Sequence, residues 1–352
     1  MMFFRPLLIM LFSLFMLLGC KKPPSQTPNY FATTSGSDVK PGSDLSFPRD
    51  HGPHNEQGIE WWYITANLAD EQGNEYGVQW TLFRIKADNA KVESPWWDNN
   101  FYFAHFAIES DEKHLAFERS GRSGQVNIVA HPFSANIDDW SLKSKESTYL
   151  PLKLTAKESN ASVALTLDGG PMILHGENGY SQKTPEGNAS YYYSFPLLNA
   201  SGQLTLNGKT VEVKGSAWLD REWSGGLMGN SYAGWDWFSI QANDLKSGLM
   251  AFCLRDTNQE YKYCSGTKFD DKGKVHKINN REIKLAPTSY SKLDCKLYPI
   301  AWQLHVKDQE PVIINSVNKD SRNRLSIPYW EGRIKTTGAI SGKGYVELVG
   351  YE

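Results

Sequence analysis

Short runs of alternating apolar and polar residues fill most of the chain after residue 45. In the run at 62–68 every second side chain is apolar, which is the period of a β-strand with one buried face. Turn-forming stretches such as DEQGNE at 70–75 separate these runs. Beyond the first twenty residues, no apolar stripe of helical period continues for twelve residues. The pattern therefore predicts an all-β protein built from antiparallel strands.

The number of strand-like runs favours two β-bodies rather than one. Beyond residue 45 the chain has 352 − 45 = 307 residues, more than an ordinary single domain of roughly 100–200 residues. Many short strands with Gly-containing turns are typical of antiparallel barrels or sandwiches. We expect one domain at 46–225 and a second at 226–352, with the boundary soon after Trp223.

The N-terminus predicts a lipid-anchored envelope protein. Residues 1–19 resemble a signal peptide, with Arg5 before an apolar run too short to span a bilayer. The run ends in LLGC, the form of a bacterial lipobox, so we expect Cys20 to be lipidated; an ordinary secretory signal is the alternative. Lys21 favours the outer membrane, facing the periplasm, over the inner membrane. Residues 20–45 are expected to form a flexible tether, so the membrane would be a partner through the lipid anchor.

Charge and cysteine content narrow the picture further. The net charge is −2 and the basic residues are scattered, which excludes a nucleic-acid-binding surface. Cys253 and Cys264 flank a turn-like DTNQ and are candidates for a disulfide across a hairpin. With Cys20 set aside, an odd number of cysteines remains, which predicts at least one free thiol, or three with Cys295 included.

Alternation along the first strand places a carboxylate among apolar side chains. Glu60 shares its face with Trp62, whereas Tyr63 points to the other face. A turn centred on Gln72 would set Arg84 opposite Glu60. Because a buried carboxylate needs a partner, we interpret Glu60 and Arg84 as a structural ion pair first and a catalytic feature second.

The stretch GWDWFSI contains a second carboxylate with an apolar setting. Alternation groups Asp236 with Phe238 and Ile240, flanked in sequence by Trp235 and Trp237. Burial raises the pKa of a carboxyl group, so a protonated Asp236 in an aromatic pocket is a candidate general acid. An aspartate satisfied by backbone donors at a strand end is the equally weighted alternative.

A third group of charges lies in GSAWLDREWSG. Asp220 and Glu222 share a strand face with Trp218, while Arg221 and Trp223 share the other face. Paired carboxylates suggest acid–base chemistry of the glycosidase kind. With an arginine between them, a charge-compensated strand end is the commoner structural explanation.

Metal and cofactor motifs are weak or absent in the sequence. His51 and His54 lie near Glu56 and Glu60, which raises a zinc hypothesis. The two histidines occupy a loop with Gly and Pro rather than a helix, and no HExxH, P-loop or GxSxG pattern occurs. We therefore expect hydrogen bonds between this loop and the barrel, with no metal and no cofactor.

Five ordered motifs resemble the AttH-like/carotenoid 1,2-hydratase (hydroxyneurosporene synthase) family. Between residues 47 and 351 they read FPRDHGPHNEQGIEWWYITANL with YGVQWTLFR, YFAHFAI, GYSQK with YYYSFP, GSAWLDREWSG with GWDWFSIQ, and YWEGRIKTTGAISGKGYVELVGY. The resemblance implies two lipocalin-like β-barrels in tandem. It also implies that the histidine-containing loop leads into the first barrel strand.

The resemblance implies two kinds of function. Hydratases of the family add water to an isolated double bond of an apolar polyene without a cofactor, which requires an acid, aromatic faces and a positioned water. Asp236 with Trp223, Trp235 and Trp237 would suit these roles. Those hydratases resemble DHxW where this chain has Arg221, a residue that does not exchange protons near neutral pH. Members of the AttH branch are associated with ABC export systems of the envelope.

We therefore expect an envelope lipoprotein that binds an apolar or isoprenoid-like small molecule or lipid, as an accessory to an ABC transporter. A hydro-lyase with Asp236 as general acid is the alternative, and a structural envelope protein is the third hypothesis. The cleft between the barrels is the expected site, because small barrels are filled by side chains. The expected ligand-binding residues are Trp223, Trp235, Trp237, Trp62, Tyr63, His51 and His54. The candidate catalytic residues are Asp236, Asp220, Glu222 and Arg221.

Overall fold

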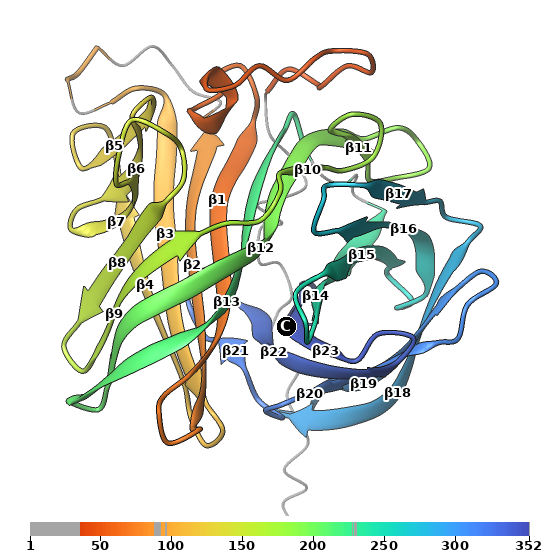
Figure 1. Ribbon diagram of the computed structural model, residues 1–352. Helices are drawn as coiled ribbons and strands as arrows, with labels where there is room; N and C mark the ends of the chain where they lie inside the picture. The colour runs from red at the N-terminus through yellow and green to blue at the C-terminus, as the bar shows by residue number, and fades with distance from the viewer. Residues whose placement is uncertain (1–35, 88–92, 96, 227, 229–230, 352) are drawn as a thin grey trace, which may run out of the picture.

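Two large antiparallel sheets make up nearly all the regular structure of the protein (Figure 1). The computed structural model describes residues 36–87, 93–95, 97–226, 228 and 231–351. The expected signal peptide, Cys20 and most of the expected tether lie outside these residues. In the part of the chain that is described, no helix is long and apolar enough to cross a membrane.

The first sheet has 13 strands and curls into a barrel-like body. Its main path runs in the order β4-β3-β2-β1-β13-β12-β9-β8-β7-β6-β5, with β10 and β11 paired to β12. A single 3-10 turn, η1 (Arg49–His51), precedes it. The strands are β1 (Ile59–Ala69), β2 (Glu75–Lys86), β3 (Asn100–Ser110), β4 (His114–Gly121), β5 (Val126–Ala130), β6 (Phe133–Ile137), β7 (Trp140–Ser144), β8 (Leu152–Glu158), β9 (Ala161–Asp168), β10 (Ile173–Leu174), β11 (Tyr180–Gln182), β12 (Ala189–Leu206) and β13 (Lys209–Ser224).

The second sheet has 10 strands and forms the second curled body. Its order is β17-β16-β15-β14-β23-β22-β20-β19-β18, with β21 paired to β22. The strands are β14 (Tyr232–Ala242), β15 (Ser247–Asp256), β16 (Tyr261–Asp270), β17 (Val275–Ile278), β18 (Ile283–Leu293), β19 (Lys296–Val306), β20 (Val312–Ser316), β21 (Arg322–Asn323), β22 (Tyr329–Gly338) and β23 (Gly342–Leu348). The chain is therefore an all-β protein of two tandem lipocalin-like barrels, and it passes from one to the other between residues 224 and 232.

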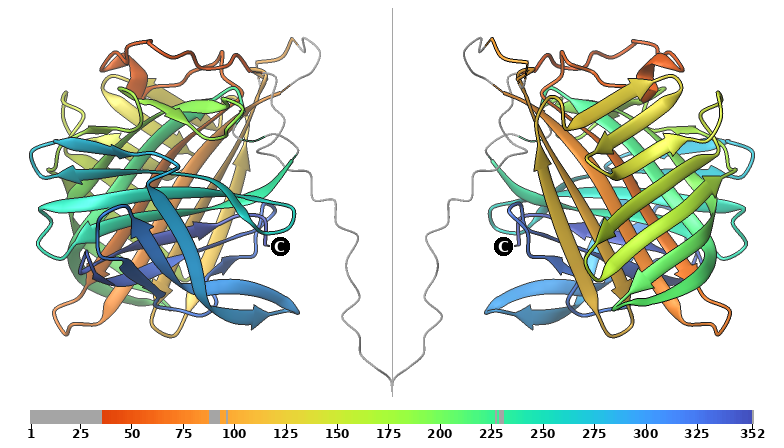
Figure 2. Two further views of the ribbon diagram at one scale, coloured as in Figure 1. Left: turned by 90° about the vertical axis from the view of Figure 1, so that its right-hand side faces the viewer. Right: turned by 90° about the vertical axis from the view of Figure 1, so that its left-hand side faces the viewer.

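Strand alternation divides the apolar side chains among three layers. On β1, Trp62 and Ile64 belong to the interior of the first barrel, whereas Tyr63 belongs to a separate cluster between the barrels. On β14, Phe238 points into the second barrel and Trp237 into the same inter-barrel cluster. The two barrels lie side by side in Figure 1, and in each view of Figure 2 one barrel lies in front of the other. The outward faces of the central strands are therefore covered by the neighbouring barrel rather than exposed to water.

Polar contacts fix how the two barrels dock. The Glu109 carboxylate and the Arg333 guanidinium, both nearly inaccessible, lie 3.1 Å apart across the interface. Close approach is made possible by Gly77 on β2, where a Cβ atom would lie 2.2 Å from Tyr345 Oη. The Gln241 side chain donates to the backbone oxygens of Pro196 and Ala217 at 2.6 and 3.0 Å. The barrels are thus joined by specific side-chain contacts as well as by apolar packing.

The cysteines differ in part from the sequence expectation. Cys253 and Cys264, the candidate pair, are directly opposite each other on β15 and β16 and form a disulfide. The expected free thiol is contradicted, since no cysteine in the described part of the chain is free. The odd count came from setting Cys20 aside, and Cys20 lies outside the described residues.

Candidate functional site

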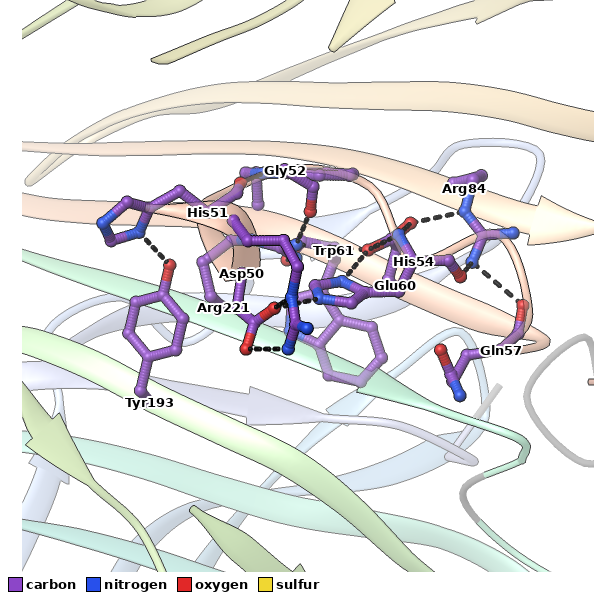
Figure 3. Close-up of polar contacts among 12 residues, drawn as sticks. Asp50, His51, Gly52, His54, Gln57, Glu60, Trp61, Arg84, Tyr193 and Arg221 are labelled. Carbon is purple, nitrogen blue, oxygen red and sulfur yellow. Dashed lines mark hydrogen bonds and ion pairs between the residues drawn. The ribbon is translucent and has the colours of Figure 1, made fainter. Parts of the chain in front are cut away.

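The histidine-containing loop closes one end of the first barrel around a buried charge cluster (Figure 3). The Glu60 carboxylate contacts Arg84 and Arg221, and all three side chains are inaccessible to solvent. The His54 backbone N–H donates to Glu60 Oε1 at 2.9 Å. Burial by itself raises the pKa of Glu60, but the hydrogen bond with the His54 ring, whose Nδ1 lies 3.1 Å from Oε2, and the two arginines hold it well below its ordinary value. The Glu60 carboxylate is paired with both guanidinium groups, so we interpret this cluster as a structural plug.

Aromatic stacking completes the plug. The His51 ring stacks on Tyr149 at 3.6 Å between centroids, and its Nδ1 lies 2.7 Å from Tyr193 Oη. The His54 ring stacks on Trp223 at 3.9 Å. Burial lowers the pKa of His51 to about 3, with help from the Arg221 charge. The imidazole of His51 is therefore neutral at ordinary pH.

These contacts change the interpretation of five residues predicted from the sequence. The Arg221 guanidinium lies over the Trp62 ring at 3.9 Å, inside the first barrel. Alternation explains this placement. Trp62 lies on the inward face of β1, Arg221 and Trp223 lie on the inward face of β13, and the two histidines lie in the loop above these strands. The residues that belong to the plug and do not line the inter-barrel pocket are Trp62, Trp223, Arg221, His51 and His54. Their expected roles in ligand binding and catalysis are not supported by this placement.

Asp236 also lies away from the residues expected to form its pocket. Its side chain is fully buried in the second barrel, where Arg255 Nε lies 2.9 Å from Oδ1 and Tyr261 Oη donates to Oδ2 at 2.5 Å. Trp235 and Trp237 point to the opposite face of β14, as period-two alternation requires. The expectation that Asp236 shares an aromatic pocket with them is therefore wrong, and its position does not support a role as general acid.

A narrow pocket lies between the two barrels and is lined by both of them. Its cavity volume, measured as the space open to the centres of water-sized molecules, is about 50 Å³, and all its empty space, including the mouth that opens to solvent, is about 680 Å³. The lining residues are Trp61, Tyr63, Phe83, Lys183, Asp220, Glu222, Trp235, Trp237, Phe252, Tyr329, Glu347 and Val349. A pocket at the cleft between the barrels agrees with the sequence expectation. Five residues that the sequence predicted for the site lie on outward strand faces and line this pocket, namely Asp220, Tyr63, Glu222, Trp235 and Trp237.

Asp220 forms a buried acid in the wall from the first barrel. Its Oδ1 accepts hydrogen bonds from Ser194 Oγ and, at 2.6 Å, from Trp218 Nε1; its Oδ2 accepts one from Tyr192 Oη at 2.8 Å. Burial raises the pKa of Asp220 to about 7, although these three donors favour the carboxylate. Trp237 Nε1 donates to Tyr192 Oη at 3.2 Å, which ties the second barrel to this wall. Asp220 can therefore exchange a proton near neutral pH.

Glu222 has a different environment on the same strand. Its Oε1 lies 2.7 Å from Lys183 Nζ and also accepts a hydrogen bond from Ser190 Oγ. The Lys183 ammonium in turn sits over the Tyr192 ring, 4.6 Å from its centroid. Neighbouring carboxylates on β13 thus differ, since Glu222 is neutralised by a lysine and Asp220 is held by neutral donors.

Carboxyl groups from the second barrel form the opposite wall. Glu347 on β23 lines the pocket, and its Oε1 accepts a hydrogen bond from Trp235 Nε1 at 2.7 Å. Behind it, Glu331 Oε1 accepts one from Tyr63 Oη at 2.6 Å. Tyr63 belongs to the first barrel, so each wall is tied to the other barrel through a hydroxyl group.

Sequence reasoning missed several lining residues. Lys183 and Glu347 lie in the motifs GYSQK and YVELVGY, which were used only for the resemblance. A charged residue directly between two apolar residues of a strand, such as Glu347 between Val346 and Leu348, was the available indication of a buried polar site. In the described part of the chain, no group of three His, Cys, Asp or Glu side chains is placed to hold a metal ion.

Comparisons with known proteins agree with this architecture. The sequence model of the AttH-like family matches residues 38–351. A Nitrosomonas europaea protein assigned as an AttH has a crystal structure with a TM-score of 0.81 and 31% identity, covering 90% of this chain and 99% of its own. Kievitone hydratase from Nectria haematococca gives a TM-score of 0.67 at 16% identity, covering 91% and 96%. CghA, solved with Sch210972, gives 0.55 at 12%, covering 92% and 97%. No curated protein sequence matches the chain.

Proposed function

The chain belongs to the AttH-like family, and on that premise we propose that it binds an apolar small molecule in the pocket between its barrels. The observation that carries the proposal is the pocket itself, in which seven of the twelve lining side chains are aromatic. Aromatic walls with a few placed polar groups are typical of small-molecule sites. An isoprenoid-like molecule fits this description, and a pocket of this kind argues against a purely structural role.

A second candidate function is favoured by Asp220. A hydro-lyase that adds or removes water at an apolar substrate needs a group that exchanges protons near neutral pH inside an aromatic site. Asp220 meets both conditions, so Asp220 rather than Asp236 is a proton-exchanging group of this site. Kievitone hydratase shares the fold at low identity, which supports the comparison of architecture only.

The cellular setting remains a proposal that rests on the N-terminal sequence. The LLGC motif and Lys21 support an outer-membrane lipoprotein facing the periplasm. Association with an ABC export system would fit a carrier of apolar molecules.

The test is mass spectrometry of the small molecules extracted from the protein purified from its own cells. We would compare the wild type with Asp220→Asn and with Asp308→Asn, an exposed turn position at positive φ where asparagine fits. One unmodified apolar molecule in all three proteins supports a carrier. A wild-type and control product that differs by one water from the Asp220→Asn ligand supports the hydro-lyase. Empty protein throughout would contradict both functions.

A further inference from the structure

Two glutamates face each other at the base of the pocket wall from the second barrel. Glu331 on β22 and Glu347 on β23 are register partners in the antiparallel sheet, so their side chains point to the same side. Their carboxyl groups lie within hydrogen-bonding reach of each other. Glu331 is 1% exposed, whereas Glu347 reaches the pocket. A proton on this pair is therefore held close to the space that a ligand would fill.

The surroundings of Glu331 favour a proton on the pair. Tyr63 Oη donates to Oε1, but Oε2 has no hydrogen-bond donor among the described residues. Two ionised carboxyl groups in contact repel each other, and burial adds to the cost of the charge. Burial and the charge of Glu347 together raise the pKa of Glu331 well above its ordinary value. One shared proton removes the repulsion and supplies the missing donor.

We propose that Glu331 and Glu347 share one proton at neutral pH and that Glu347 delivers it to the ligand in the inter-barrel pocket. Glu347 is the catalytic residue in this assignment because it lines the pocket. Glu331 is a positioning residue that keeps the proton on the pair. The inference rests on the hydro-lyase activity proposed above and identifies its acid.

The proposed step balances with Asp220 as the base on the opposite wall. The shared proton forms a C–H bond at one carbon of an alkene, and the π electron pair becomes that bond. A water oxygen attacks the resulting carbocation, whose charge is stabilised by the aromatic faces around it. The second water proton passes to the Asp220 carboxylate, and exchange with solvent then resets both acids. Tyr63 of the first barrel also lines the pocket, and its hydroxyl donates to Glu331 Oε1 of the second barrel.

The shared proton can be tested without any ligand by infrared spectroscopy. All samples carry Asp220→Asn, because Asp220, with a pKa of about 7, would add a C=O band of its own at pH 7.5. In this background we expect the C=O band of a protonated carboxyl group, and we expect Glu331→Gln to remove it. The exposed control Glu310→Gln should retain the band. If Glu331→Gln does not fold, the band of Asp220→Asn alone, followed to alkaline pH, gives the answer, since it must disappear as the pair ionises. Absence of the band, or its survival in folded Glu331→Gln, would overturn the shared proton.

Proton delivery can be tested with 2-methyl-2-heptene in heavy water, a small probe with the trisubstituted double bond of an isoprenoid end. We expect the wild type and Glu310→Gln to form the tertiary alcohol with deuterium on carbon 3. Glu347→Gln should slow this reaction by about 100-fold or more, the usual contribution of a general acid. Glu331→Gln should move the alkaline limb of the rate profile to lower pH, because an unpaired Glu347 ionises more readily; a purely structural role would leave that limb in place.

The outcomes separate the inference from the function on which it rests. Full activity in Glu347→Gln would overturn Glu347 as the donor and leave the hydro-lyase proposal standing. If no protein converts the alkene while the infrared band is present, the hydro-lyase proposal fails for isoprenoid-type alkenes, and the donor role fails with it. The shared proton would then survive as a property of the pocket alone.

Discussion

Buried carboxyl groups in this protein differ mainly in whether a cation lies beside them. Glu60 and Asp236 each contact an arginine, whereas Asp220 is held by hydroxyl and indole donors. A buried carboxylate with a cation is stabilised in its charged form, and one without it shifts toward the acid. Alternation grouped Glu60 and Asp236 with apolar side chains from the sequence, and the turn around Gln72 gave Glu60 its partner Arg84. Alternation could not show that Asp236 is paired, because Arg255 reaches Asp236 from the neighbouring strand.

Replacing Asp236 tests its structural role. Asp236→Asn would leave the Arg255 guanidinium buried without its counter-charge, so we expect a loss of about 3–5 kcal/mol in the free energy of unfolding. Urea denaturation measures this loss, with Asp308→Asn as the exposed control. The molecule extracted from folded Asp236→Asn should match the wild type. A stable variant with an altered ligand would show that Asp236 acts on the pocket after all.

Burial of His105 makes the free energy of unfolding depend on pH, and the sign of this dependence follows from its lowered pKa. Burial lowers the pKa of His105 to about 3, whereas in the unfolded chain it stays near its ordinary 6.5. Between these pH values His105 binds a proton in the unfolded state but not in the folded state. The contribution of His105 to the free energy of unfolding therefore falls as the pH drops below 6.5. Relative to His105→Gln, the wild type should lose about 2 kcal/mol of unfolding free energy between pH 6.5 and 5. Denaturant titrations at both pH values measure the difference, and a constant gap would refute a neutral buried His105.

At the scale of strands, the sequence predicted faces and register better than it predicted neighbours. The turn around Gln72 was enough to set Arg84 opposite Glu60, as the structure shows. Alternation in LDREWS correctly separated Asp220 from Arg221. It could not show that the outward faces are covered by a second barrel, since a strand with apolar residues on both sides has several possible partners. The pocket forms only when the two barrels dock, so the sequence did not identify Glu347 as a residue that lines it.

Gly77 tests how closely strands of the two barrels approach. A Cβ at this position would lie 2.2 Å from Tyr345 Oη and 2.9 Å from Arg333 Cδ. We expect Gly77→Ala to cost about 1–3 kcal/mol through overpacking. Combining it with Tyr345→Phe removes the clashing oxygen, so the double variant should recover part of the loss in a thermodynamic cycle. Strict additivity of the two substitutions would contradict the contact.

At the scale of the whole molecule, the interface between the barrels is buried and packed in the same way as the barrel interiors. It contains a continuous apolar cluster and the buried Glu109–Arg333 pair. Large apolar interfaces with buried ion pairs oppose independent domain motion. The two barrels should therefore behave as one cooperative unit, although the sequence alone predicted only that there are two.

Cooperative unfolding provides the corresponding measurement. Tryptophan fluorescence and circular dichroism should report one coincident transition in the wild type. Arg333→Met would leave Glu109 buried without its partner, and we expect it to lower the unfolding free energy by about 3–5 kcal/mol. Arg324→Met, at a guanidinium that is 65% exposed, should change it by no more than about 0.5 kcal/mol. Two separate transitions in the wild type would contradict the single unit.

The location of the pocket on the outward strand faces has an evolutionary consequence. Residues such as Trp61, Phe83 and Phe252 shape the pocket, but the alternate positions beside them fill the barrel interiors. Mutations in one set leave the other untouched, so ligand preference can diverge between descendants of a common ancestor while both barrels stay intact. The same separation makes the pocket residues a natural target for directed evolution. Selection for a new ligand would then proceed without a search for a new fold.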